Sequence, residues 1–163
     1  MEECRVNIFR TSDDPVECAV SLADQHICKM PVETAQMLAT ALRERGVDVD
    51  GLYRSTHRLH PCTRWAGASR ASALWLLSHG FALCDEYEAR FGREHGSRGQ
   101  LRLIAKLLHA IPDEPQQPPP ICVPDHLRAQ PVHEAYRLTL VEKHRAWSVA
   151  GRPARWRGEV EPA

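Results

Sequence analysis

Three ionisable residues of different types interrupt an amphipathic stretch near the start of the sequence. His26, Lys29 and Glu33 lie three and then four residues apart within LADQHICKMPVETAQML, residues 22–38. This spacing places them along one helical face, provided that the helix continues through Pro31. A base, an ammonium and a carboxylate in one pocket can divide acid and base roles. The alternative is a solvated ion pair beside a satisfied histidine.

A second group of such residues occurs in HRLHPCTRWAGASRASA, residues 57–73. His57, His60 and Cys62 come just before a predicted helix. Arg64 falls in the first turn of that helix, where unpaired backbone N–H groups favour an anion. The small residues that follow leave a bare helix face that a DNA backbone could approach. Tight packing against another helix is the commoner reason for such a face.

A metal site is an alternative use of the same residues. His26 and Cys28, together with His60 and Cys62, would supply two histidines and two cysteines. Zinc sites more often use ligand pairs separated by two or three residues, and a single intervening residue strains the geometry. We therefore expect no metal and no other cofactor.

Basic and aromatic residues are interleaved near the C-terminal end of the chain. The formal net charge is zero, so the whole molecule is not steered towards nucleic acid. A local basic surface can still bind phosphates. The alternative is a solvated helix face with a buried tryptophan. The candidate DNA-binding residues are Arg137, Lys143, Arg145, Trp147, Arg152 and Arg155.

The hydrophobic pattern predicts a single all-α domain over residues 1–163 that positions these groups. Val6, Ile8 and Phe9 suit an extended segment or an anchored arm. Asp14 caps a first helix with Pro15 at its start, and apolar spacing continues to Met30, where Pro31 begins a second helix or makes a kink. Further helices are predicted from Thr63 to Gly92 with Gly80 as a candidate break, over 98–111 and over 132–147.

Loops and irregular ends complete this prediction. Residues 48–62 form a loop, and the proline-rich residues 112–124 form a connector that cannot be a helix or a central strand. Residues 1–6 and 157–163 are expected to be flexible ends. The six cysteines form no CxxC pair, and the chain has neither a signal segment nor a long apolar run. We therefore expect a soluble, intracellular and disulfide-free protein.

Several blocks of the sequence resemble the pyrimidine-dimer DNA glycosylase family of T-even phage. They are LADQH with Glu33 seven positions after His26, NIF near the start, HPCTRWA, LCDEYEARFGREH and AYRLTLVEKHRAW. The resemblance spans Asn7 to Trp156. It implies a compact helical fold that bends duplex DNA and extrudes a nucleotide. It also implies that an N-terminal α-amine forms a Schiff base at the sugar C1′, with the glutamate assisting.

The sequence departs from that family at the nucleophile. Met1 is followed by Glu2, whose size blocks methionine removal. We therefore expect the same mode of DNA binding with a different reaction. The chain also resembles the amino-acid:DNA transferases of thymine hypermodification. These join an amino acid, typically glycine, to 5-phosphomethyl-uracil in duplex DNA with loss of phosphate. The partners implied are double-stranded DNA and free glycine, without a membrane, in the cytoplasm of an infected bacterial host.

The residue types meet the demands of this transfer reaction. Lys29 and Arg64 are candidates to bind the leaving phosphate, and Glu33 or His26 to accept the proton of the incoming ammonium. Two alternatives remain, a glycosylase/AP lyase with a reactive amine and a non-catalytic DNA-binding module. Arg64 or Arg70 could bind the amino-acid carboxylate, and the further candidates for substrate binding are His60, Gln36 and Asn7.

Overall fold

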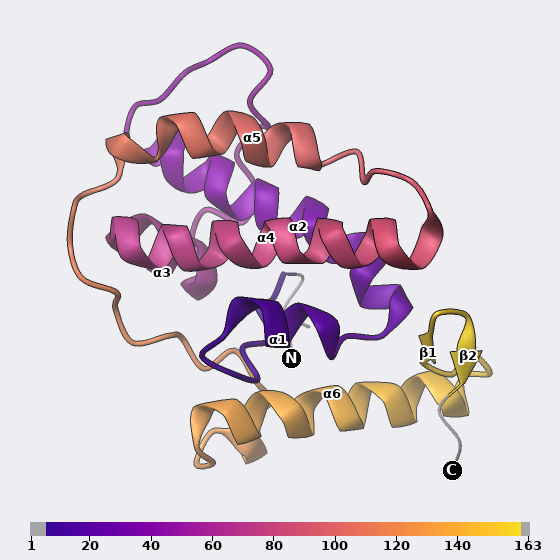
Figure 1. Cartoon of the computed structure of the whole chain (residues 1–163). Helices are drawn as coiled ribbons and strands as arrows, with labels where there is room; N and C mark the ends of the chain where they lie inside the picture. The colour runs from indigo at the N-terminus through magenta and orange to yellow at the C-terminus, as the bar shows by residue number, and fades with distance from the viewer. Residues whose placement is uncertain (1–5, 161–163) are drawn as a thin grey trace.

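The computed structural model describes residues 6–160. Helices α2 and α4 pack against each other at the centre, α5 covers them on one side, and α1 and α6 lie on the other (Figure 1). The elements are α1 (Pro15–Val20), α2 (Asp24–Glu44), α3 (Pro61–Ala68), α4 (Arg70–Phe91), α5 (Arg98–Leu107), the 3₁₀ turns η1 (Leu108–Ala110) and η2 (Asp125–Leu127), α6 (Val132–Val149), and the strands β1 (Arg155–Trp156) and β2 (Glu159–Val160).

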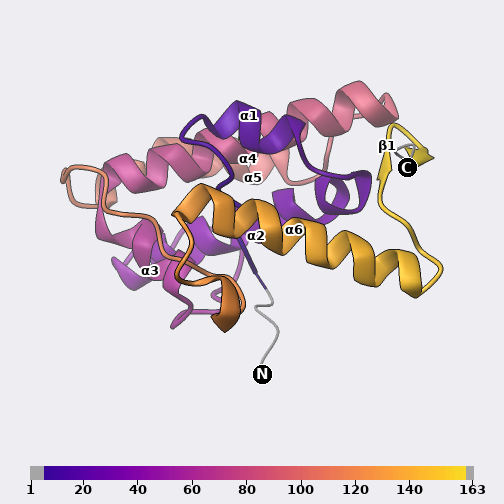
Figure 2. The same ribbon diagram turned by 90° about the horizontal axis from the view of Figure 1, so that it is seen from below.

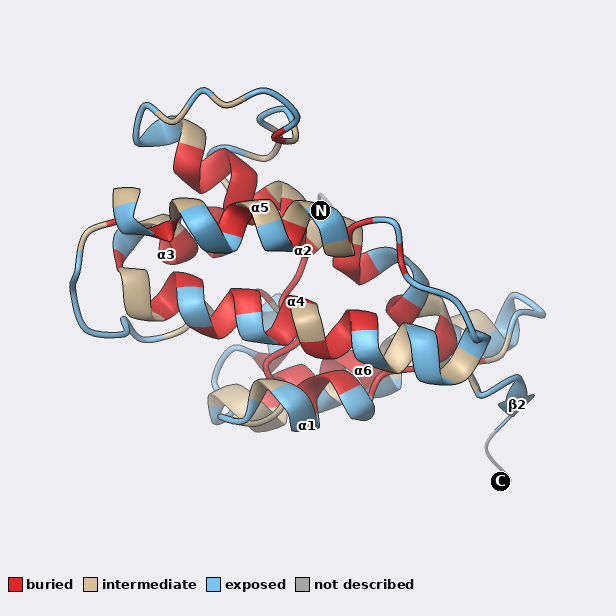
Figure 3. Cartoon of the chain, turned by 45° about the horizontal axis from the view of Figure 1, so that its top comes forward, coloured by how far each residue is buried: buried red, intermediate tan, exposed pale blue. Residues whose placement is uncertain are grey.

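The predicted all-α class is confirmed, and the later elements follow the prediction closely. Residues 98–111 form α5 and η1, and α6 extends the predicted last helix by two residues to Val149. The loop that ends at α3 and the proline-rich connector that ends at η2 contain neither helix nor strand. Buried residues follow α2 and one face of α4, whereas these connections are largely exposed (Figure 3). No helix in residues 6–160 is long and apolar enough to cross a membrane.

The first helical region breaks at a different place from the one expected. The α1 helix starts as predicted, with the Asp14 carboxylate accepting the Val16 N–H at 2.8 Å. It ends at Val20, and α2 then runs without interruption through Pro31, so the prediction of a second helix starting at Pro31 is wrong. The alternative, a helix that continues through Pro31, is confirmed.

Arg90 explains the early break. Its side chain is 3% exposed, and its guanidinium donates to the carbonyl oxygens of Val20 at 3.0 Å and Leu22 at 2.7 Å. The same group donates to the Asp24 carboxylate at 3.0 Å. Carbonyls at a helix end need partners, and this arginine from α4 supplies them at the corner between α1 and α2.

The second long helical region breaks at Ser69 instead of Gly80. Ser69 has extended backbone angles (φ −148°, ψ 145°), and its hydroxyl accepts the Ser72 N–H at 3.0 Å, which caps α4. Gly80 lies inside α4, where a Cβ atom would come within 2.9 Å of Thr34 Cγ2 and 3.1 Å of Leu101. The glycine is therefore needed for close helix packing, and the prediction that it breaks the helix is wrong.

Both ends of the described chain are held against the helices. Residues 6–10 are buried, which confirms the anchored arm. Strands β1 and β2 pair in an antiparallel hairpin, so the expectation of an irregular tail is wrong as far as residue 160. Arg157 and Gly158 both have positive φ (52° and 81°), as a two-residue hairpin turn requires. The other residues predicted as flexible ends, 1–5 and 161–163, lie outside the described residues.

Candidate active site

Glu33 is the centre of the candidate site. It lies on α2 with its side chain 14% exposed, one turn after Lys29, whose side chain is 55% exposed. Lys29 Nζ lies 3.5 Å from Glu33 Oε1, and the Asn7 backbone N–H also bonds the carboxylate. Burial raises the pKa of Glu33, although Lys29, Asn7 and His57 oppose this rise. A carboxyl group with a raised pKa suits proton transfer near neutral pH.

Asn7 holds the N-terminal segment beside this carboxylate. Its side-chain Nδ2 donates to the Cys122 carbonyl at 3.0 Å, and its Oδ1 accepts the Phe9 N–H at 2.9 Å. Both ends of the amide are therefore engaged within the protein. The backbone N–H of Asn7 is the group that bonds Glu33, so this predicted substrate-binding residue lies in the site and positions it.

His26 is buried whereas Lys29 is exposed, although the two residues are only three positions apart on α2. His26 is 1% exposed, and its ring packs against the rings of Phe9 and Trp147 with centroid distances of 4.7 and 4.9 Å. Neither ring nitrogen has a hydrogen-bond partner within residues 6–160. Burial lowers the pKa of His26 to about 3, and the charge of Lys29 adds to this effect. The imidazole is thus neutral at pH 7, and its catalytic role stays a prediction that these surroundings do not favour.

His57 is a further member of the site, and the spacing of residues in the sequence did not predict it there. Its charge acts on Glu33, and its φ of 50° is strained for a residue with a side chain. The Thr56 hydroxyl lies 2.9 Å from His57 Nδ1, and the Thr56 N–H donates to Thr40 Oγ1 at 2.9 Å. These bonds tie the loop to α2. The histidine-rich loop was visible in the sequence, but its approach to α2 was not.

The other residues predicted to bind substrate are distributed over several surfaces. Gln36 is half-buried one turn after Glu33 on α2. Arg64 is exposed on α3, in a groove that also contains Arg58. His60 caps α3, because its Nδ1 accepts the Cys62 N–H at 3.1 Å.

Arg70 has a different partner from the one expected. Its guanidinium donates to the carbonyl oxygens of His109 at 3.1 Å and Ile111 at 3.3 Å, and lies 3.7 Å from the Asp113 carboxylate. These bonds fasten the start of the proline-rich connector to α4. The structure therefore gives Arg70 a role in the fold, and its predicted contact with an amino-acid carboxylate gains no support.

The four-ligand metal set considered from the sequence is not assembled. Cys28 is exposed on α2, while His26 packs into the aromatic cluster. His60 and Cys62 instead meet Cys122 from the proline-rich connector.

The candidate DNA-binding residues lie along α6 and the hairpin. Helix α6 crosses the first half of α2 and the N-terminal segment (Figure 2), and Trp147 makes the ring contact with His26. Arg145 and Arg152 are exposed, and Lys143 is close enough for its charge to act on His26. Arg155 donates to the Gly158 carbonyl at 3.1 Å. Their contact with DNA stays a prediction.

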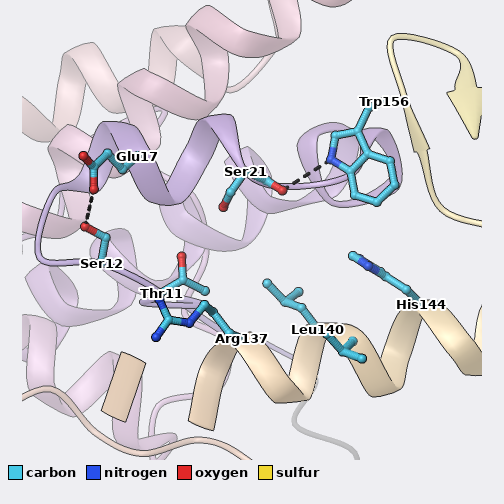
Figure 4. Close-up of a pocket in the computed structure, with 9 residues that line it drawn as sticks. Thr11, Ser12, Glu17, Ser21, Arg137, Leu140, His144 and Trp156 are labelled. Atoms are coloured by element: carbon cyan, nitrogen blue, oxygen red, sulfur yellow. Dashed lines mark hydrogen bonds between the residues drawn. The ribbon is translucent and has the colours of Figure 1, made fainter. Parts of the chain in front are cut away.

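Arg137 lines an open groove between α1 and α6. The groove has a volume of about 500 Å³, and Trp156 of the hairpin closes one end of it (Figure 4). Arg137 also pairs with Glu134 at 2.7 Å. Glu33 is not among the residues that line this groove, so the groove and the candidate site are separate features.

The LADQH motif joins the hairpin to the start of α2. The Asp24 carboxylate accepts the backbone N–H groups of Arg157 at 3.0 Å and Gly158 at 2.8 Å. Gln25 donates to the Pro153 carbonyl at 2.8 Å and accepts the Arg155 N–H at 3.2 Å. The two polar residues before His26 are therefore anchors for the C-terminal hairpin, a role that the sequence pattern did not reveal.

Comparison with known proteins identifies the family. No curated protein matches the chain, and no solved structure matches it. The family model described as pyrimidine dimer DNA glycosylase matches residues 6–97, which is more than half of the chain. The matched segment contains Asn7, Lys29, Glu33 and His57. The chain therefore belongs to the pyrimidine dimer DNA glycosylase family, a family of enzymes that act on DNA.

Proposed function

We propose that the protein is a base-excision enzyme that acts on a pyrimidine nucleotide in duplex DNA as a glycosylase and AP lyase. The observation that carries the proposal is the half-buried Glu33 carboxylate, which has a raised pKa and is bonded by the Asn7 N–H. A glutamate so held can move protons and stabilise positive charge that develops on a sugar. Membership of the family supports the same reaction class.

An amine is needed for the lyase reaction. It attacks C1′ of the deoxyribose, and the base leaves with the electron pair of the glycosidic bond and takes up a proton. The C1′–O4′ bond then opens as O4′ takes up a proton and the nitrogen loses one, which leaves a Schiff base between C1′ and the amine. The residues before Val6 lie outside the described residues. Lys29 Nζ, 3.5 Å from Glu33 Oε1, is an amine within reach of the carboxylate. We therefore consider Lys29 and the N-terminal amine as candidate nucleophiles.

Reduction with borohydride on DNA that contains an abasic site tests this proposal. We expect a covalent protein–DNA adduct, and peptide mapping identifies the amine that carries it. Glu33→Gln keeps the shape of the side chain but removes its basicity, and should abolish turnover with little loss of DNA binding. Glu44→Gln is the matched control, because Glu44 is exposed at the end of the same helix. Absence of the adduct, or equal turnover in both variants, would contradict the proposal.

A second candidate is the transfer of glycine to 5-phosphomethyl-uracil in duplex DNA. The 55% exposure of Lys29 next to Glu33 favours it, because such an ammonium can reach a phosphate. In this reaction the glycine nitrogen bonds the 5-methylene carbon, and the C–O bond breaks so that phosphate leaves with the electron pair. Glu33 takes the proton that the glycine ammonium must lose before attack. Resemblance of the sequence blocks to the transferases supports this candidate, which places the enzyme in the cytoplasm of an infected bacterium.

Nucleoside mass analysis, together with the borohydride test, separates the glycosylase, the transferase and a non-catalytic DNA-binding module. DNA with 5-phosphomethyl-uracil, incubated with glycine and the protein, yields a glycine-modified thymine only if the transferase proposal holds. Lys29→Met should then weaken binding to this DNA by about tenfold, the lower end for a charge-assisted bond, since Lys29 is half-exposed. Binding to ordinary thymine DNA should barely change. A non-catalytic module would give neither the borohydride adduct nor the new nucleoside.

A further inference from the structure

We propose that His60, Cys62 and Cys122 form a zinc site that fastens the proline-rich connector to α3. One donor atom from each residue lies within 4.8 Å of the other two, and both cysteines are buried. The sulfur atoms are 3.4 Å apart. The three residues come from the cap of α3, its second residue and the far end of the connector, 60 residues later in the sequence.

The donor set selects the metal. Two thiolates and an imidazole are typical ligands of zinc, which binds sulfur at about 2.3 Å in tetrahedral sites. Two such bonds at the tetrahedral angle separate the sulfur atoms by about 3.8 Å. The observed separation of 3.4 Å is near this value and far from the length of about 2.0 Å in a disulfide. No fourth His, Cys, Asp or Glu joins the group within residues 6–160.

The imidazole can reach the metal at a small cost. His60 Nδ1 accepts the Cys62 N–H, and Nε2 is buried without a hydrogen-bond partner in the part of the chain that the structure describes. When the ring binds zinc through one nitrogen, the other nitrogen carries the proton. Neither nitrogen can then accept the hydrogen bond from the Cys62 N–H. The hydrogen bond from the Cys62 N–H and the thiol hydrogen bond from Cys62 to Cys122 are lost, and both thiols release their protons to solvent, whereas one nitrogen–metal and two thiolate–metal bonds are gained.

Cys122 is a junction between the metal group and the rest of the fold. Its carbonyl oxygen accepts from Asn7 Nδ2 at 3.0 Å, and its N–H donates to the Tyr136 hydroxyl at 3.1 Å. The metal would therefore hold α3, α6 and the N-terminal segment in one arrangement around the connector. The Asn7 N–H also bonds Glu33, so the clamp supports the candidate site without belonging to it.

Metal analysis of the full chain tests the inference. We expect one zinc ion per chain after purification in zinc-containing buffer. Replacement by Co²⁺ should give the intense thiolate-to-cobalt absorption and the visible bands of a tetrahedral site. Cys62→Ser and Cys122→Ser should each lower zinc affinity by at least a hundredfold. Cys28→Ser is the matched control, because Cys28 is exposed on α2, and should retain zinc.

Several results would overturn the inference. They are a chain without stoichiometric zinc, unchanged zinc affinity in Cys122→Ser, or an intact mass two hydrogens lower because Cys62 and Cys122 form a disulfide. If a serine variant does not fold, the cobalt spectrum of the unmodified chain still decides, since the charge-transfer absorption requires thiolate ligands. Addition of a chelator should also lower the Tm of the unmodified chain, and an unchanged Tm would contradict the structural clamp.

Discussion

Gly80 provides the sharpest test of how α2, α4 and α5 pack together. A methyl group at this position would lie 2.9 Å from Thr34 Cγ2 and 3.1 Å from both methyl carbons of Leu101. Leu101 can rotate away, but the β-branched Thr34 is stiff on a buried helix face. In an open helix interior, Gly→Ala stabilises by about 0.5–1 kcal/mol, whereas overpacking costs about 1–3 kcal/mol. We therefore expect Gly80→Ala to lower the free energy of unfolding by about 1–2 kcal/mol.

Urea and thermal denaturation measure this change. For a chain of this size the loss corresponds to a fall in Tm of about 3–6 °C. Gly99→Ala in α5 is the control, because nothing lies within 4 Å of its added methyl group, and it should be neutral or slightly stabilising. Thr34→Ser removes Cγ2, so Gly80→Ala should cost less in that background. A Gly80→Ala variant as stable as the unmodified chain would refute the packing argument, as would an equal cost in both backgrounds.

Four further predictions concern the site, the hairpin and DNA binding. If Glu33 is the base and Lys29 is not the nucleophile, activity should rise with pH through the raised pKa of Glu33, and Lys29→Met should move this rise to higher pH because it removes a charge that lowers that pKa; a pH profile that does not move would exclude the coupling between Lys29 and Glu33. The pKa of His26 is about 3 in the folded protein, below its ordinary value of 6.5, so the free energy of unfolding decreases as pH falls from 6.5 towards 3. His26→Phe removes this titration, so between pH 7 and 5 the free energy of unfolding of the variant should decrease by about 2 kcal/mol less than that of the unmodified chain. Asp24→Ala leaves Arg90 buried with one carboxylate fewer, which should lower the free energy of unfolding by about 3 kcal/mol and make the hairpin sensitive to limited proteolysis. Asp50→Ala, on an exposed turn, is the control and should cause neither change. Replacing Lys143 and Arg145 by Ala should flatten the salt dependence of DNA affinity by about one unit per lost phosphate contact, and an unchanged slope would place DNA on another surface.

Local patterns in the sequence were sufficient for much of the helical framework. Asp14 and Pro15 mark the start of α1 because a capping carboxylate and a proline act within one turn of the chain. The amphipathic spacing of α5 also identifies that helix without reference to its neighbours. The pairing of Lys29 with Glu33 follows directly from their four-residue separation on a continuous helix. Each of these features depends on residues a few positions apart.

Only the tertiary structure decided where the helices break and what surrounds the ionisable groups. Arg90 ends α1 from about 70 positions away, and the contact between His26 and Trp147 joins residues more than 120 positions apart. His57 likewise reaches Glu33 through a loop, and Cys122 reaches Cys62 through the connector. Spacing along one helix reports which side chains share a face, but not which distant segment covers that face. The burial that raises the pKa of Glu33 and lowers that of His26 comes from those distant segments, because desolvation depends on every atom packed around a group.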